Sequence, residues 1–406
     1  MSITFVRNLA LLLLIFASFA TAQAQPEDTK PPARNVILLI GDGMGLTQVS
    51  TAFYYSDSVP NFERFPITGL IKTSSSSHKI TDSAAGATAF SAGVSTYNGA
   101  IGVDTAQQSV PTLVEILSAD SLSTGVVSTS SITHATPASF YAHVDVRSEQ
   151  DEIAAQLLTS DVDFFAGGGT DFFVKRKDQA NYYDSLVQYG FVVDTTQLVV
   201  DSISSLDQHY GYLIDSVPSL DQRYGYLLAP DGMPRMLDGR GDFLPQATQM
   251  ALDYLSQDED GFFLMVEGSQ IDWGGHANDA EYIITETLDF DKTLGVALDF
   301  AERESNTLVI VTADHETGGF ALSSAGEKDG TGSDYDTLNG TFSTGGHTAT
   351  LIPVFAYGPG SEAFSGIYQN TQIFRKIMQA LRPEDSVSTK SGSEKVRGIY
   401  PTEPEQ

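Results

Sequence analysis

The 406-residue sequence contains no cysteine, and this absence narrows the chemistry open to the chain. Without thiols it can form no disulfide and carry no lipid anchor on a cysteine side chain. Any metal ion that it binds must be held by oxygen and imidazole ligands. These ligands suit zinc, manganese or magnesium.

Basic residues are scarce. The sequence has 22 lysines and arginines against 52 aspartates and glutamates, which gives a formal net charge of −30. We therefore expect no nucleic-acid binding through a basic face. An acidic excess is common on strongly hydrated surfaces, and it is also expected where carboxylates gather around cations. Both explanations stay open at this point.

Long apolar runs are missing except near the N-terminus, where Arg7 precedes "LALLLLIFASFA" and the small-residue pattern "AQA". This is the pattern of a secretory signal peptide over residues 1–24, cleaved after Ala22 or Ala24. The run is shorter than the roughly 20 apolar residues that span a membrane. We expect a periplasmic or secreted protein with no membrane anchor after cleavage.

Short apolar runs alternate with helix-like stretches through most of residues 25–383, which we take as the main domain. Continuous apolar strands between amphipathic helices predict an α/β fold. The expected architecture is a three-layer sandwich, with a mostly parallel central sheet flanked by helices on both faces. The predicted strands are "NVILLIGDG" (35–43), "STGVVSTSS" (123–131), "DFFAGGG" (163–169), "GFFLMVEGSQID" (261–272), "TLVIVTADH" (307–315) and "PVFAYGPG" (353–360).

The periodicity weakens between residues 171 and 245, which we expect to form a peripheral insertion lobe. This segment contains a tandem near-repeat, "SLDQHYGYLI" and "SLDQRYGYLL", over residues 205–228. Two copies are too few for a solenoid, so a local duplication is the simpler explanation. Residues 384–406 have the composition of a polar C-terminal tail.

Carboxylates and histidines gather at the ends of the predicted strands, the edge where ligands bind in such folds. A carboxylate beside apolar strands is costly to desolvate unless a cation or partner compensates it. A helix cap could explain one such residue, but not easily all of them. They are also too many for one tetrahedral site, so we favour a multi-metal cluster over scattered structural roles. They are Asp42, Glu267, Asp272, His276, Asp314, His315 and His347.

Three further residues have two explanations each. Ser83, in "TDSAAGATAF", either caps a helix or acts as a nucleophile at the helix N-terminus. Arg147 either forms a surface ion pair or grips two phosphoryl oxygens with its planar fork. Thr136 either caps a helix before Pro137 or supplies an oxygen to a hard cation.

Six motifs together resemble those of the alkaline phosphatase family. They are "GDGMG", "TDSAAGATAFSAGVSTYNGAIGVD", "THATPASFYAH" with Arg147, "VEGSQIDWGGH", "TADHETGG" and "GGHT", and they span roughly residues 35 to 380. They occur in the order found in that family, and their combination is far more specific than any one of them. The chain looks most like the secreted cold-adapted and marine bacterial branch.

The resemblance implies that Ser83 is the nucleophile and that Arg147 holds the phosphoryl group. It also implies two Zn²⁺ and one Mg²⁺ per chain and a homodimer. One zinc would be held by Asp272, His276 and His347, the other by Asp42, Asp314 and His315, and the magnesium by Asp42, Thr136 and Glu267.

The chain departs from the enterobacterial pattern at two positions. His134 and Trp273 stand where that pattern has an aspartate and a lysine. An imidazole lowers the negative charge beside the third metal site, which leaves the identity of that metal open. An indole removes a positive charge near the phosphate. Asp82 is expected to orient Arg147, while His143 is interpreted as structural.

These inferences predict a hydrolase of small phosphate monoesters that forms a phosphoserine and accepts a broad range of alcohols. A phosphodiesterase of the same superfamily is an alternative, because metals and a nucleophile alone do not select monoesters. A secreted protein that binds metal or phosphate without turnover is a second alternative. A sulfatase that makes its formylglycine from cysteine is excluded by the absence of cysteine.

Overall fold

A computed structural model describes residues 31–198, 205–206, 213–214, 220, 222–325 and 334–383. The predicted signal peptide and the predicted tail lie outside these residues, so the domain boundaries stay a prediction. From Pro32 onward the described chain belongs to one compact unit. Among the described helices, none combines the length and apolar character needed to cross a membrane.

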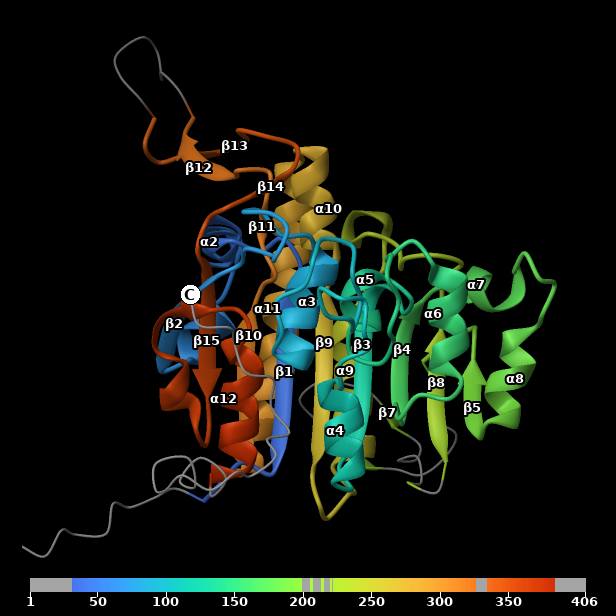
Figure 1. The fold of residues 1–406 in the computed structure, drawn as a ribbon. Helices are drawn as coiled ribbons and strands as arrows, with labels where there is room; N and C mark the ends of the chain where they lie inside the picture. Colours follow the sequence, from blue (N-terminus) through green and yellow to red (C-terminus); the bar gives the residue numbers. More distant parts are fainter. Residues whose placement is uncertain are drawn as a thin grey trace, which may run out of the picture. The chain divides into compact units, whose positions relative to one another are not determined.

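A ten-stranded sheet runs through the described chain (Figure 1). Neighbouring strands are parallel except at β15, which is antiparallel to both of its neighbours. This confirms the mostly parallel sheet. The order is β16 (Gly366–Gln369), β2 (Ile67–Lys72), β15 (Ile352–Tyr357), β10 (Thr307–Thr312), β1 (Asn35–Gly41), β9 (Phe262–Gly268), β3 (Ser123–Ser131), β4 (Phe164–Gly168), β8 (Arg223–Leu227) and β5 (Phe191–Asp194).

Helices cover both faces of this sheet, as Figure 1 shows. On one face, α9 (Phe243–Leu255) and α11 (Ala280–Arg303) pack against each other and against the strands. On the other face lie α3 (Ser83–Ala92), α4 (Leu113–Ala119), α5 (Ala135–Ala138) and α12 (Gln372–Leu381). The central strands β1, β3, β9 and β10 are therefore buried along their whole length. This burial explains the apolar runs of β1, β9 and β10. The three-layer sandwich is confirmed.

The remaining helices frame the carboxyl ends of the strands and one edge of the sheet (Figure 1). They are α2 (Leu46–Tyr55), α6 (Gln150–Leu157), α7 (Thr170–Val174), α8 (Tyr182–Gln188) and α10 (Gln270–Ala277). Two small ladders complete the C-terminal part. One pairs β11 (Glu316–Thr317) with β14 (His347–Thr348), and the other pairs β12 (Ala321–Ser324) with β13 (Leu338–Thr341).

The segment between residues 171 and 245 lies at one edge of the sheet and supplies two of its strands, β5 and β8. The first copy of the near-repeat contains the short antiparallel strands β6 (Ser205–Leu206) and β7 (Leu213–Ile214). The second copy supplies β8. Edge strands that are only partly buried need few apolar residues, which explains why this segment showed little periodicity.

Arg240 is buried between two carboxylates of α11. It donates hydrogen bonds to Glu286 and Asp289, and all three side chains are almost fully enclosed. Glu286 also accepts a hydrogen bond from Met236 N–H at 2.9 Å. The ion pairs therefore fasten the loop before α9 to α11. Burial raises the pKa of Asp289 to about 6, even though the Arg240 charge lowers it.

We predict that Arg240→Met lowers the free energy of unfolding by about 3–5 kcal/mol, because it leaves two buried carboxylates without their cation. Arg235→Met is the matched control. Arg235 forms an exposed ion pair with Asp238, and its loss should leave the free energy of unfolding almost unchanged. Equilibrium denaturation in urea measures both variants, and equal losses would contradict the prediction.

Candidate active site

Ser83 is the first residue of α3, and Asp82 is the residue that caps this helix. The Asp82 side chain accepts a hydrogen bond from Ala85 N–H at 3.1 Å, so the cap does not depend on the Ser83 hydroxyl. Ser83 is 2% exposed, and its Oγ lies 3.3 Å from Asp42 Oδ2 and 3.4 Å from His315 Nε2. The hydroxyl therefore faces the strand ends at a helix N-terminus, a place that favours anions.

Strand register brings three carboxylates together at the carboxyl ends of the central strands. Asp42 follows β1, Asp314 follows β10, and Glu267 lies near the end of β9. In the register, Ile40 is level with Glu267 on one side and with Thr312 on the other. The three side chains are fully buried, and this arrangement is the one that the sequence predicted from the strand ends.

Burial raises the pKa values of these acids. The pKa of Asp42 lies well above its usual range because of burial first and the charges of Asp314, Asp272 and Glu267 second. Burial also raises the pKa of Glu267 to about 7 and raises that of Asp314. These groups ionise readily only when positive charge is brought to them.

Two imidazoles face each other beside Asp272. His276 Nδ1 lies 2.7 Å from the Gly345 carbonyl, and His347 Nδ1 lies 2.9 Å from the Thr81 carbonyl. A carbonyl only accepts, so each Nδ1 carries a hydrogen, and Nε2 is the nitrogen that can offer a lone pair to a metal ion. The two Nε2 atoms are 3.2 Å apart and lie 3.4 and 3.7 Å from the Asp272 oxygens. Lone pairs this close repel unless a cation joins them, so the residues fit a metal ion.

His315 connects this pair to the strand-end acids. Its ring stacks on that of His347 with the centroids 3.5 Å apart, and its Nε2 lies 3.2 Å from Asp314 Oδ2 and 3.5 Å from Asp42 Oδ1. Burial, followed by the nearby His347, lowers the pKa of His315 to about 3. The ring is therefore neutral at physiological pH, as a metal ligand must be.

The surroundings of Glu267 also fit a cation. Its Oε2 accepts hydrogen bonds from the hydroxyls of Ser128 and Ser269, both at 2.6 Å. Within the described chain, Glu267 Oε1, Thr136 Oγ1 and His134 Nδ1 are buried and make no hydrogen bond of ordinary geometry. Buried polar atoms without a partner are rare in native proteins, and a hard cation would satisfy such oxygens.

The geometry groups the ligand atoms much as the resemblance implied. In each group, one atom per residue lies within 4.8 Å of the others. All three ligands predicted for the second zinc, Asp42, Asp314 and His315, form one group. In the group that corresponds to the first zinc, His315 stands in the place of His276. In the group that corresponds to the magnesium, His134 joins Asp42 and Glu267. The groups are Asp272–His315–His347, Asp42–Asp314–His315 and Asp42–His134–Glu267.

Arg147 lies beside the cluster with its side chain 28% exposed. Its Nη1 donates to Asp82 Oδ2 at 3.1 Å, and its Nη2 lies 3.4 Å from His134 Nε2. The Trp273 ring stands edge-on to His134, with the centroids 6.1 Å apart. Burial, with a smaller effect of Arg147, lowers the pKa of His134 to about 3, so this ring is neutral too.

Sequence reasoning missed several hydroxyls that orient these residues. Thr317 donates to Asp272 Oδ1 at 2.5 Å and lies 3.2 Å from His315 Nδ1. Thr317 belongs to the motif "TADHETGG", which was read only for its charged residues. Ser128 and Ser269 lie directly beside predicted strand ends, which was the one signal available for them.

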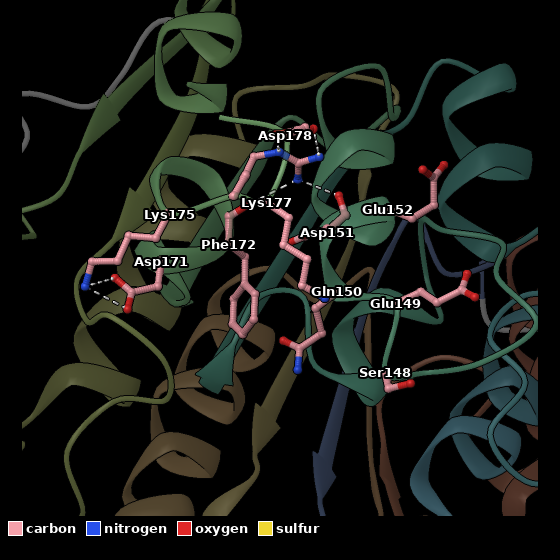
Figure 2. Close-up of a pocket in the computed structure, with 11 residues that line it drawn as sticks. Ser148, Glu149, Gln150, Asp151, Glu152, Asp171, Phe172, Lys175, Lys177 and Asp178 are labelled. Atoms are coloured by element: carbon pink, nitrogen blue, oxygen red, sulfur yellow. Dashed lines mark hydrogen bonds and ion pairs between the residues drawn. The ribbon is translucent and has the colours of Figure 1, made fainter. Parts of the chain in front are cut away.

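A cavity of about 890 Å³ lies next to the cluster, between α6 and α7, but no residue of the cluster lines it (Figure 2). Lys175 pairs with Asp171 across one side of it. Ser148, the residue after Arg147, lies at its rim. The cavity therefore neighbours the residue predicted to bind phosphate without containing the nucleophile or the metal-ligating side chains.

Comparisons with known proteins agree with this geometry. The family model described as alkaline phosphatase matches residues 33–333. The chain is 34% identical to an alkaline phosphatase of Escherichia coli strain K12, over 89% of this chain and 88% of that protein. It is 32% identical to alkaline phosphatase 3 of Bacillus subtilis strain 168, over 91% and 94%.

Solved structures give the same match. The alkaline phosphatase from the Antarctic bacterium TAB5 is 52% identical, with a TM-score of 0.80, and the match covers 86% of this chain and 98% of that one. A variant of that TAB5 protein has been solved with magnesium bound in its M3 site.

We predict that removal of divalent cations lowers the thermal unfolding midpoint, and more so at mildly alkaline than at mildly acidic pH. The pKa of Glu267 is about 7 in the folded chain against an ordinary value of 4.5. Between these values the metal-free native state holds more protons than the unfolded chain, so its free energy of unfolding falls as pH rises. Bound metal displaces these protons and offsets that loss.

Calorimetry with and without a chelator at the two pH values measures the effect. If the chelator lowered the unfolding midpoint by the same amount at both pH values, the predicted coupling between protons and metal would be contradicted.

Proposed function

Because the chain belongs to the alkaline phosphatase family and is a metal-binding phosphomonoesterase, we propose that it releases phosphate through a covalent phosphoserine on Ser83. One observation carries this proposal. The Ser83 hydroxyl lies at a helix N-terminus within 3.5 Å of both Asp42 and His315, inside a cluster of buried acids and imidazoles. A serine that served only as a helix cap would have no need of these neighbours.

The metals would be two Zn²⁺ and one Mg²⁺ per chain. The donor set supports this, because it consists of imidazole nitrogens and oxygens, with the hydroxyl of Thr136 and the carboxylate of Glu267 around the third position. Bound divalent ions would lower the pKa of a coordinated hydroxyl, as they lower that of a coordinated water to about 7. Elemental analysis of the purified protein measures this stoichiometry. The zinc ligands would be Asp272, His276 and His347 for one ion, and Asp42, Asp314 and His315 for the other.

Ser83 carries the first step. Its hydroxyl proton passes to water, Oγ forms a bond to phosphorus, and the bond from phosphorus to the alcohol oxygen breaks on the opposite side. The alcohol takes up a proton and leaves. In the second step, water attacks phosphorus in line, the bond to Ser83 Oγ breaks, and Ser83 regains its proton as phosphate departs.

Arg147 and the start of α3 bind the phosphoryl group in both steps. Asp82 accepts from Arg147 Nη1, and His134 Nε2 lies 3.4 Å from Nη2. A guanidinium has five N–H donors, so donors remain for two phosphoryl oxygens. The backbone N–H groups at the N-terminus of α3 add positive potential at Ser83. These groups all address the phosphoryl group and none addresses the alcohol, which supports broad specificity for the leaving group. The match to curated alkaline phosphatases favours a monoesterase over a diesterase or a binding protein without turnover.

We predict that Ser83→Ala abolishes the phosphoenzyme that can be trapped in acid and lowers kcat by at least about a thousandfold, because the covalent step is lost. The wild-type protein should hydrolyse a chiral phosphate monoester with retention of configuration at phosphorus, because two inversions cancel. Stereochemical analysis of the new ester, formed when the phosphoryl group is transferred to an acceptor alcohol in place of water, measures this.

Ser185→Ala is the matched control, since Ser185 lies on α8 and its hydroxyl donates to the carbonyl of Asn181. Its phosphoenzyme yield should equal that of wild type. Inversion at phosphorus in the wild-type reaction would exclude the covalent intermediate.

The mature protein would be exported, periplasmic or secreted, and homodimeric. The predicted signal peptide supports export, and apolar side chains exposed along and after α2, such as Phe53, Tyr54 and Val59, support a contact with a second copy. Mass spectrometry under denaturing conditions should give a chain that begins after Ala22 or Ala24. Under native conditions it should give twice that mass. A chain that retains its first residues would contradict the proposed export, and a monomer would contradict the proposed dimer.

A further inference from the structure

Arg147 lies at the end of a short ladder between two loop segments, residues 99–103 and 143–147, which we call the arginine ladder. Ile101 and Val144 exchange both of their backbone hydrogen bonds at 3.0 Å. Arg147 N–H then donates to the Gly99 carbonyl at 2.8 Å. The backbone position of Arg147 is therefore set by the partner segment of the ladder as well as by its own chain.

The ladder and the guanidinium share one oxygen atom. Asp82 Oδ2 accepts hydrogen bonds from Gly99 N–H at 3.0 Å and from Arg147 Nη1 at 3.1 Å. Asp82 itself is fixed as the cap of α3, one residue before Ser83. A shift of the ladder would consequently change the distance from the guanidinium to Asp82 and to the nucleophile together.

Two side chains that touch neither Ser83 nor the metal-ligating cluster hold the ladder in place. Gln156, on α6, pairs with both backbone polar groups of His143: His143 N–H donates to Gln156 Oε1 at 2.8 Å, and Gln156 Nε2 donates to the His143 carbonyl at 3.1 Å. The Gln156 side-chain amide thus adds one more pair of hydrogen bonds to those of the ladder.

The ring of His143 ties the ladder to a second helix. Its Nδ1 lies 2.6 Å from the Gly102 carbonyl, and its Nε2 lies 3.0 Å from Glu115 Oε1. Glu115 belongs to the capping box at the start of α4. Burial acts against a charged ring, but the Glu115 carboxylate and the Gly102 carbonyl outweigh it and raise the pKa of His143. Both ring nitrogens face oxygen acceptors, and these contacts connect the ladder to α4.

We propose that His143 and Gln156 are positioning residues for phosphate binding, because they fix the ladder that sets the place of the Arg147 guanidinium. The inference rests on the proposed role of Arg147 as the residue that grips phosphate. It assigns a functional consequence to a histidine that sequence analysis took to be structural. It also predicts that their effect on phosphate binding passes through Arg147.

A double-mutant cycle tests this with the metal-loaded protein. Competitive inhibition by inorganic phosphate is measured for wild type, Gln156→Met, Arg147→Ala and the double variant. We expect Gln156→Met to raise the inhibition constant about three- to thirtyfold, the range typical of coupled neighbours, and to raise KM more than it lowers kcat. In the Arg147→Ala background the same substitution should change the inhibition constant by less than about twofold.

Gln249→Met is the matched control, because Gln249 is a half-buried helical glutamine that bonds to Asp253 within α9. Its inhibition constant should equal that of wild type. His143→Phe repeats the cycle from the other anchor, with circular dichroism and thermal melting to establish that each variant is folded.

The outcomes separate the inference from its premise. If Gln156→Met raised the inhibition constant by the same factor with Arg147 present and in the Arg147→Ala background, the inference would be overturned. Gln156 would then act on phosphate binding by another route. An unchanged inhibition constant in Gln156→Met would overturn it as well. If Arg147→Ala alone left phosphate inhibition unchanged, the proposed role of Arg147 would fail, and the inference with it.

Discussion

Repulsion among buried carboxylates is the constraint on which the rest of this site depends. The register of β1, β9 and β10 brings Asp42, Glu267 and Asp314 to one edge of the sheet, and α10 adds Asp272. Removing such charges from water costs several kcal/mol each unless they are compensated. The Arg147 guanidinium does not compensate these acids, because it binds Asp82. This arrangement of acids can bind divalent cations. The imidazole lone pairs that face one another can bind the same ions.

Close backbone approach is what makes the cluster compact. A Cβ at Gly43, whose φ is +71°, would lie 2.7 Å from the Cα of Asp272, so only glycine allows the turn after β1 to reach α10. A Cβ at Gly86 would lie 2.9 Å from the Cβ of Asp314. The helix that begins with Ser83 therefore packs directly against a strand-end acid. Larger residues at these positions would separate the nucleophile from the metal-ligating side chains.

The sequence predicted the layers of the fold and the meeting of the strand-end acids, because both follow from hydrophobic runs and from where those runs stop. The strand β5 at the edge of the sheet and its neighbour β8 were not foreseen, since a half-buried strand leaves little periodicity. The carbonyls of Thr81 and Gly345, which fix the histidine rings, could not be found, because any residue carries a carbonyl. Whether Ser83 capped its helix was open from the sequence, and the structure gives the cap of α3 to Asp82. The roles of the site residues in catalysis stay predictions.

We propose that the site has two halves, a cluster that binds cations and an arginine that the ladder positions for the phosphoryl group. Ser83 lies beside both. Catalysis by this arrangement depends on the cations, because the hydroxyl of Ser83 is otherwise a weak nucleophile. The most direct test is phosphate release from a chromogenic monoester by protein that has been stripped of divalent ions and shown to be folded. The account predicts no release above background, with activity restored when Zn²⁺ and Mg²⁺ are returned. Full activity of the folded, metal-free protein would contradict it.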